Sequence, residues 1–182
     1  FNDPNMHHAN FPYPWLKGIS NPKKFFNDEI NKLTKSKGID PKKDLCGFMI
    51  ETFQGWGAIF YPQEFMNELS RYAKKNNMLI TFDEMQAGFG RTGKLFGYMH
   101  YGITPDIICC GKGASSSLPL SIVLGSSEIM DLPDEGSMSS THSANPLSCV
   151  AGHVNLKELF DNKLIDNSRI LGKILHEKLN KL

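Results

Sequence analysis

The sequence predicts an α/β fold in which a mostly parallel sheet is flanked by helices. Short apolar runs of strand length alternate along the chain with segments whose apolar residues recur at helical spacing. Alternation of this kind is typical of chains that pack helices against a parallel sheet. The composition agrees, because 40% of the 182 residues are hydrophobic and 21% are charged, as in ordinary globular domains.

Three segments have the apolar spacing of amphipathic helices. The first is residues 22–36, where Pro22 suits the first turn. The second is residues 62–76, which carry basic residues near the C-terminal end. The third extends from Asn145 to the end of the chain, with residues 161–182 as a C-terminal helix.

Four apolar runs have the length and composition of strands buried within such a sheet. They comprise residues 45–51, 78–82, 106–110 and 120–124. Ligands of parallel sheets bind at the carboxyl ends of the strands. Glu51, Asp83 and Lys112 all fall at such ends, and these three residues are therefore the first candidates for a functional site.

Charge and composition argue against several function classes. Twenty basic and nineteen acidic side chains give a net charge of +1, so no electrostatic argument favours nucleic acid or an anionic membrane as a partner. The longest apolar runs are far too short to span a bilayer. The four cysteines form no C-x-x-C pair, which favours reduced thiols in a cytoplasmic protein. The only histidine pair, His7–His8, has no ligand cluster around it, so we expect no metal site.

The glycine-rich segment Gly88–Gly93 permits two nucleotide-binding interpretations. It fits the dinucleotide pattern G-x-G-x-x-G, but glycines of that pattern open a helix, and the residues that follow here are a poor helix start. Extended to Lys94, it fits the phosphate-binding pattern G-x-x-x-x-G-K. Leu95 then stands where that loop needs Ser or Thr to hold magnesium. The sequence therefore disfavours both nucleotide interpretations.

A third interpretation joins Asp83 and Lys112. Lys112 follows a strongly apolar run and has a glycine on either side, so desolvation would favour the neutral, nucleophilic amine. Such an amine forms Schiff bases with carbonyl compounds, and the glycines would let a flat ligand approach the backbone. Asp83 would keep a pyridine nitrogen protonated, and this pair is typical of pyridoxal phosphate (PLP) chemistry. Taken alone, a strand-end lysine and aspartate are more often structural.

Five sequence motifs, in chain order, carry a resemblance to a known family. They are IETFQGWGAIFYP (50–62), ITFDEMQAGFGRTG (80–93), PDIICCGKG (105–113), LPL (118–120) and STHSANPLSCVAG (140–152). Together they closely resemble the class III aminotransferases, which are PLP enzymes of fold-type I and include ornithine and 4-aminobutyrate aminotransferases. The resemblance implies that this chain corresponds to the large domain of that fold.

The resemblance implies a role for each matching residue. Lys112 would bind PLP as a Schiff base and move the proton between substrate and cofactor, and Asp83 would pair with the pyridinium nitrogen. Gln86 would lie near the 3-hydroxyl oxygen of PLP, and Met85 stands beneath the ring, where the family usually has Val. Thr141 would bind the phosphate of the PLP held by the partner subunit, since the family's sites lie at a homodimer interface.

Glu51 is a substrate-side candidate. The resemblance matches it to an acid that in many members faces an arginine near the substrate. The alternative is that Glu51 is a strand-end acid that caps a turn.

The function that the resemblance implies is PLP-dependent transfer of an amino group from an amino donor to a 2-oxo acid. The same lysine and aspartate would also serve a PLP aminomutase, racemase or decarboxylase, and the alternative from another class is a non-catalytic scaffold.

The resemblance also suggests how the chain is divided. Residues 1–20 are expected to be irregular, residues 21–160 to form the cofactor-binding core of the large domain, and residues 161–182 to lead towards a small domain. The family's phosphate cup, ring-covering aromatic residue and carboxylate-binding arginine have no match here. We therefore expect these 182 residues to be inactive by themselves.

Overall fold

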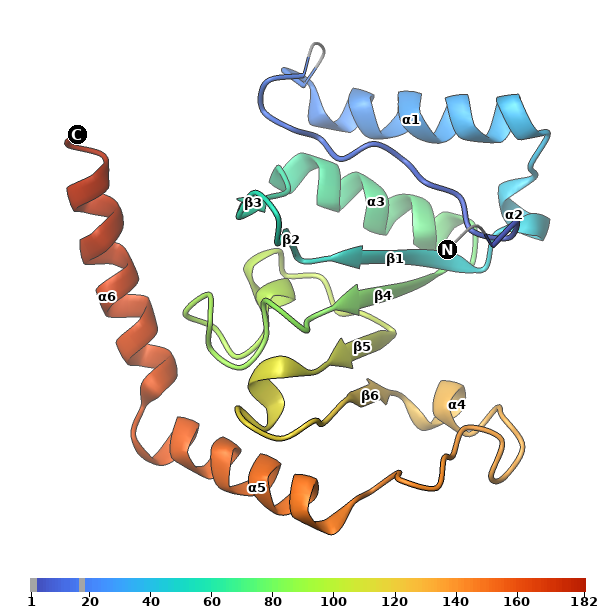
Figure 1. Ribbon diagram of the computed structural model, residues 1–182. Helices are drawn as coiled ribbons and strands as arrows, with labels where there is room; N and C mark the ends of the chain where they lie inside the picture. The colour runs from blue at the N-terminus through green and yellow to red at the C-terminus, as the bar shows by residue number, and fades with distance from the viewer. Residues whose placement is uncertain (1–2, 17–18) are drawn as a thin grey trace.

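A four-stranded sheet lies at the centre of the structure (Figure 1), a computed structural model that describes residues 3–16 and 19–182. Its strands, in spatial order, are β1 (Gly47–Glu51), β4 (Leu79–Asp83), β5 (Ile107–Cys110) and β6 (Ile122–Gly125). β1, β4 and β5 run parallel, whereas β6 is antiparallel to β5. The predicted α/β fold with a mostly parallel sheet is confirmed, and all four strands overlap the runs expected to form them.

Two helices, α1 (Pro22–Lys37) and α3 (Gln63–Lys75), pack together on one face of this sheet (Figure 1). The Asn21 side chain accepts a hydrogen bond from the Lys24 N–H at the start of α1, and Gly38 ends that helix with a left-handed φ of 65°. The core between helices and sheet contains Phe26, Ile30, Phe65, Met66, Leu69, Ala73, Met78, Ile80, Phe82, Tyr101 and Ile103.

The opposite face of the sheet is largely open. Because alternate residues of a strand point to opposite faces, Phe48 and Ile50 of β1 pack against the helices, while Met49 between them is 65% exposed. On that same face Val123 is 50% exposed and Leu79 is 37% exposed. The expectation that residues 45–51 form a buried strand is therefore wrong for this face. Burial on both faces needs helices on both, and α1 and α3 cover only one.

Several short elements were not expected from the sequence. They are α2 (Pro41–Asp44), the hairpin of β2 (Phe53–Gln54) and β3 (Ile59–Phe60), the 3₁₀ turns η1 (Gly97–His100) and η2 (Lys112–Ala114), and α4 (Ser127–Met130). Elements of two to four residues are too short to show a hydrophobic period, so pattern alone does not reveal them.

The C-terminal region consists of two helices, α5 (Pro146–Asp161) and α6 (Leu164–Leu179), that meet at an angle (Figure 1). The Asn145 side chain caps α5 by accepting the N–H groups of its first turn. Between the helices, Lys163 adopts a left-handed φ of 52°, which turns the chain. Many apolar side chains of both helices remain exposed, among them Leu147, Val150, Val154, Leu171, Ile174 and Leu175.

The domain division at residues 20 and 160 stays a prediction. Residues 1–2 and 17–18 of the first expected segment lie outside the described part of the chain. Among residues 3–16 and 19–182, no helix combines the length and the apolar character needed to cross a membrane.

Candidate cofactor site

The sheet brings the three charged strand-end residues to one edge. Glu51 and Asp83 are paired residues at the ends of β1 and β4, and Asp83 in turn pairs with Cys109 of β5. Lys112 begins η2, two residues after β5 ends. The parallel order of these strands therefore places a carboxylate and an amine at neighbouring strand ends, as the sequence predicted.

The Asp83 side chain is held in one orientation. Its Oδ1 accepts a hydrogen bond from the backbone N–H of Met85 at 2.9 Å, which closes a turn directly after the strand. Its Oδ2 makes no hydrogen bond with any residue that the structure describes. Asp83 is half-buried, so this second oxygen can accept a proton donor from a ligand at the strand ends.

Lys112 lies in a backbone conformation that is unusual for a side-chain-bearing residue. Its φ is 41°, in the left-handed region that costs a non-glycine residue about 1 kcal/mol or more. The side chain is exposed, so the desolvation expected to favour the neutral amine is not present in this chain. The reason is position: Lys112 begins a turn beyond the apolar end of β5 and does not lie among the strand's buried side chains.

An open hollow of about 560 Å³ adjoins Lys112, a volume in the range of small-molecule sites. Its lining comprises Met85, Gly111, Lys112, Ser116, Ser117, Leu118, Pro119, Leu120 and Ser121. A Cβ on Gly111 would lie 3.4 Å from Met85 Cγ and 3.6 Å from its Sδ, so the Met85 side chain packs close to the backbone beside Lys112. The structure thus brings Met85 and Lys112 to the same hollow.

Glu51 and Gln86 meet at Gly55, in the β2–β3 turn. Glu51 Oε2 accepts a hydrogen bond from the Gly55 N–H at 3.3 Å. A Cβ on Gly55 would lie 3.1 Å from both Glu51 Oε1 and Gln86 Oε1. Glu51 therefore does cap a turn, which was the alternative left open by the sequence, and its substrate-side role stays a prediction.

Thr141 lies apart from the other candidate residues. It is exposed, in the turns that connect α4 to α5, and no side-chain hydrogen bond joins it to the described residues. A residue that acts on the partner subunit's cofactor would not contact the site of its own chain, and that role stays a prediction.

The glycine-rich loop packs against α6 and opens no helix. Gly90 and Gly93 have φ values of 89° and 81°, and a Cβ on Gly90 would lie 3.0 Å from Ile165 Cγ1. A Cβ on Gly93 would lie 2.9 Å from Arg169 Cβ. The segment continues as turns into η1, so neither nucleotide-binding interpretation finds the helix N-terminus that it requires.

Sequence reasoning missed one buried acid beside the site, Glu84. Its side chain is 0% exposed, Oε2 accepts from the Gly97 N–H at 2.8 Å, and Oε1 accepts from the Tyr98 N–H at 2.8 Å. Burial raises the pKa of this carboxyl group, and the two backbone N–H groups partly offset that effect. The signal was the period of two in β4, because Glu84 continues the buried positions Ile80 and Phe82.

Comparison with known proteins accounts for this arrangement. The family model described as aminotransferase class-III matches residues 2–182. The chain is 34% identical to the 4-aminobutyrate aminotransferase of Mycobacterium leprae over 98% of its own length and 41% of that protein. It is 33% identical to the acetylornithine aminotransferase of Aquifex aeolicus, over 93% of its own length and 43% of that protein. The chain therefore spans less than half the length of these relatives.

Solved structures agree with the sequence relatives. An S-selective transaminase from Arthrobacter sp. superposes with a TM-score of 0.77 at 32% identity, covering 86% of this chain and 34% of that one. An ornithine aminotransferase from Toxoplasma gondii, described with partial occupancy of PLP at its active site, gives a TM-score of 0.73 at 31% identity. That match covers 82% of this chain and 35% of the Toxoplasma protein. Because the family model matches nearly the whole chain and the solved structures share its fold, this chain belongs to the class III aminotransferases.

Proposed function

We propose that the protein containing this chain is a PLP-dependent aminotransferase that moves an amino group from an amino donor to a 2-oxo acid. The observation that carries the proposal is the placement of Asp83 at the end of β4 and of Lys112 just beyond the adjacent strand β5, where Lys112 and Met85 line an open hollow. Membership of the class III aminotransferases supports the same reaction.

The residues at the hollow fit PLP. Bound PLP supplies an aldehyde that captures primary amines and a pyridine ring that withdraws electrons from an attached carbon. Lys112 is the amine to hold the aldehyde, and Gly111, which lines the same hollow, carries no side chain that would keep a flat ring from the backbone. Met85 supplies an apolar, polarisable surface on which such a ring can rest.

Asp83 and Lys112 divide the proton handling between them. The Met85 N–H fixes Asp83 Oδ1, which leaves Oδ2 to accept a hydrogen bond from the ring nitrogen and to favour its protonated form. Lys112 Nζ, once released from the cofactor, is the group to take a proton from the substrate carbon and return it. Gln86 is assigned to the oxygen substituent of the ring, and Glu51 to the substrate side.

The assembly proposed is a homodimer with shared sites, in which Thr141 binds the phosphate of PLP held by the partner subunit. The exposed position of Thr141 supports this assignment. We assign the protein to the cytoplasm, because the four cysteines are all free and a reducing compartment keeps them so.

Covalent labelling tests the proposal. The full-length protein is incubated with PLP and reduced with borohydride, and the modified peptide is mapped by mass spectrometry. We expect the pyridoxyl label on Lys112. Lys94 is the internal control, because it is an exposed lysine of the nearby glycine-rich loop whose Nζ donates to the Met99 carbonyl. A label on Lys94 or another lysine, with Lys112 unmodified, would contradict the assignment.

A second assay separates the reaction types. Amino transfer that depends on an added 2-oxo acid identifies an aminotransferase. An aminomutase, racemase or decarboxylase would turn over without that acceptor, and a non-catalytic scaffold would take no label at all.

A further inference from the structure

The loop of residues 85–96 connects two parts of the candidate site. It begins with Met85 at the hollow, and it includes Phe89, whose Cβ lies 3.2 Å from the Cβ position of Gly113 beside Lys112. The position of this loop therefore affects the surfaces on both sides of the lysine.

One carboxylate joins the two ends of this loop. Glu84 immediately precedes it, and the Gly97 and Tyr98 N–H groups that bond the Glu84 side chain immediately follow it. The Glu84 N–H also donates to the Cys109 carbonyl at 2.8 Å, which attaches the start of the loop to β5. The Tyr98 ring stacks on Phe82 at a centroid distance of 6.0 Å, so the end of the loop is attached to the core.

The contact leaves little freedom for adjustment. Glu84 is fully buried, so no water can replace a lost N–H bond. A Cβ on Gly97 would lie 2.4 Å from Thr52 Oγ1 and 2.8 Å from Ala87 Cβ, so the Gly97 N–H group cannot shift without moving those neighbours.

We propose that Glu84 is a positioning residue of this site: its carboxylate closes loop 85–96 and thereby sets where Met85 and Gln86 lie. The proposal rests on the PLP-dependent function inferred above. Glu84 touches neither substrate nor cofactor in this assignment. It acts through the backbone, while its neighbour Asp83 provides the carboxylate for the ring.

The test is Glu84→Gln in the full-length protein. The amide oxygen can accept a hydrogen bond from one of the two N–H groups. The amide NH₂ then faces the other N–H group, and no water can reach this buried donor to replace the lost bond. We expect the dissociation constant for PLP, measured by titration of the apoprotein, to rise about tenfold or more, because misplaced binding groups lose affinity steeply. We also expect faster trypsin cleavage after Arg91, an exposed residue of the same loop.

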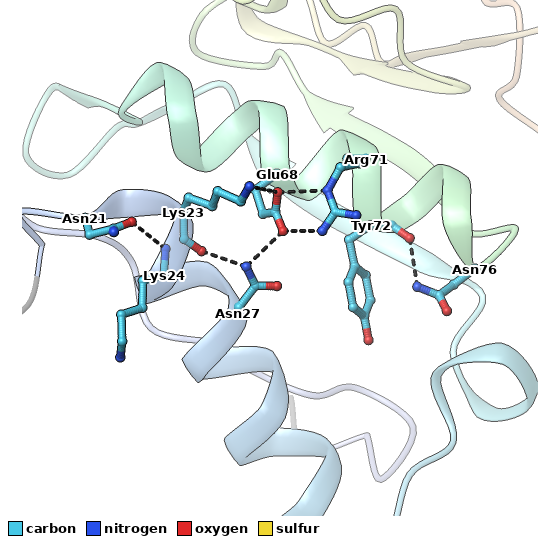
Figure 2. A network of polar contacts seen from close by, with 8 residues as sticks. All are labelled: Asn21, Lys23, Lys24, Asn27, Glu68, Arg71, Tyr72 and Asn76. Atoms are coloured by element: carbon cyan, nitrogen blue, oxygen red, sulfur yellow. Dashed lines mark hydrogen bonds and ion pairs between the residues drawn. The ribbon is translucent and has the colours of Figure 1, made fainter.

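The matched control is Glu68→Gln. Glu68 is a buried carboxylate of α3 (3% exposed) that accepts hydrogen bonds from Asn27 of α1 and from Arg71 of its own helix (Figure 2). It makes no hydrogen bond with the described residues of loop 85–96. This variant should lose stability yet keep the wild-type affinity for PLP and the wild-type cleavage at Arg91. If Glu84→Gln behaves in the same way as this control, Glu84 is only structural and the proposal is overturned.

A second variant covers the case in which Glu84→Gln does not fold. Gly97→Ala keeps the carboxylate and displaces its donor, so it should raise the PLP dissociation constant and the cleavage at Arg91 in the same direction. Wild-type values in this variant would refute the proposal. If the wild type binds no PLP, the proposed function fails, and cleavage of the apoprotein at Arg91 still decides whether Glu84 holds the loop.

Discussion

A network around Glu68 joins α1 to α3, and removing its charge gives a prediction that can be worked from the contacts. The Glu68 carboxylate accepts hydrogen bonds from Asn27 Nδ2 at 2.8 Å and from Arg71 Nε at 2.9 Å, and a second one from Arg71 Nη2 (Figure 2). Lys23 Nζ forms an ion pair with the same carboxylate at 3.9 Å. The substitution Glu68→Gln keeps the size of the side chain and removes the charge that these donors share.

The magnitude follows from the pKa. Hydrogen bonds from Arg71, joined by the Asn27 amide, hold the pKa of Glu68 at about 2 instead of 4.5. A depression of this size corresponds to at most about 3 kcal/mol of stability. Arg71 and Lys23 are 57% and 63% exposed, so solvent screens the network and we expect about 1–2 kcal/mol. Because the folded pKa is the lower one, this stability is present above pH 4.5 and is lost as the pH falls towards 2.

The assay is urea unfolding of the full-length protein at pH values between about 3 and 7, followed by hydrogen exchange on peptides of α1 and α3. Wild type should lose protection in these helices as the pH falls, whereas Glu68→Gln should start lower and change less. Glu64→Gln is the matched control, since Glu64 lies exposed on the same helix and the charge change is the same. If the stability of Glu68→Gln fell with pH as steeply as that of the wild type, the reasoning would be refuted.

Three further predictions concern the site, the glycine-rich loop and the open surfaces. Asp83→Asn should fold normally, because Asn keeps an Oδ1 for the Met85 N–H, yet lower kcat for amino transfer at least about 10²-fold; near-normal turnover would contradict its role. Gly93→Ala should lower the free energy of unfolding by about 2 kcal/mol or more, and Gly102→Ala by only about 1 kcal/mol, as measured by thermal unfolding. Both glycines have positive φ, but only at Gly93 would the added Cβ meet a neighbour, Arg169 of α6. Equal losses would rule out the α6 contact. A polypeptide of these 182 residues alone should self-associate, through its exposed apolar side chains, and transfer no amino group; a monodisperse, active monomer in light scattering and assay would count against this.

The elements that the sequence predicted well are those with local signals. The expected helix 22–36 is found as Pro22–Lys37, because Asn21 and Gly38 carry the start and stop signals within one residue of its ends. The strand-end candidates were also predictable. Once the strands are parallel, Glu51 and Asp83 must come to the same edge.

Features that depend on distant contacts were not predictable. The exposure of Met49 depends on whether a helix covers its face, which the strand's own composition does not state. The glycine-rich loop was interpreted from its spacing, yet its glycines accommodate α6, and Ser168 there donates to the Arg91 carbonyl, 77 residues away in sequence. The exposure of Lys112 likewise depends on how the chain turns after β5, which apolarity of the strand did not reveal.

The acidic pair at the end of β4 shows how one short segment can supply both chemistry and its support. A strand alternates its side chains, so Asp83 and Glu84 must point to opposite faces. Asp83 faces the open side, where a ligand can reach Oδ2, and Glu84 faces the helix-covered side, where the Gly97 and Tyr98 N–H groups bind it. A shift of one residue in the register of β4 would exchange these roles, burying the carboxylate meant for the ring and exposing the one that closes the loop. The ladder from Gly47–Leu79 to Glu51–Asp83 therefore determines which acid serves the site as much as it determines the fold.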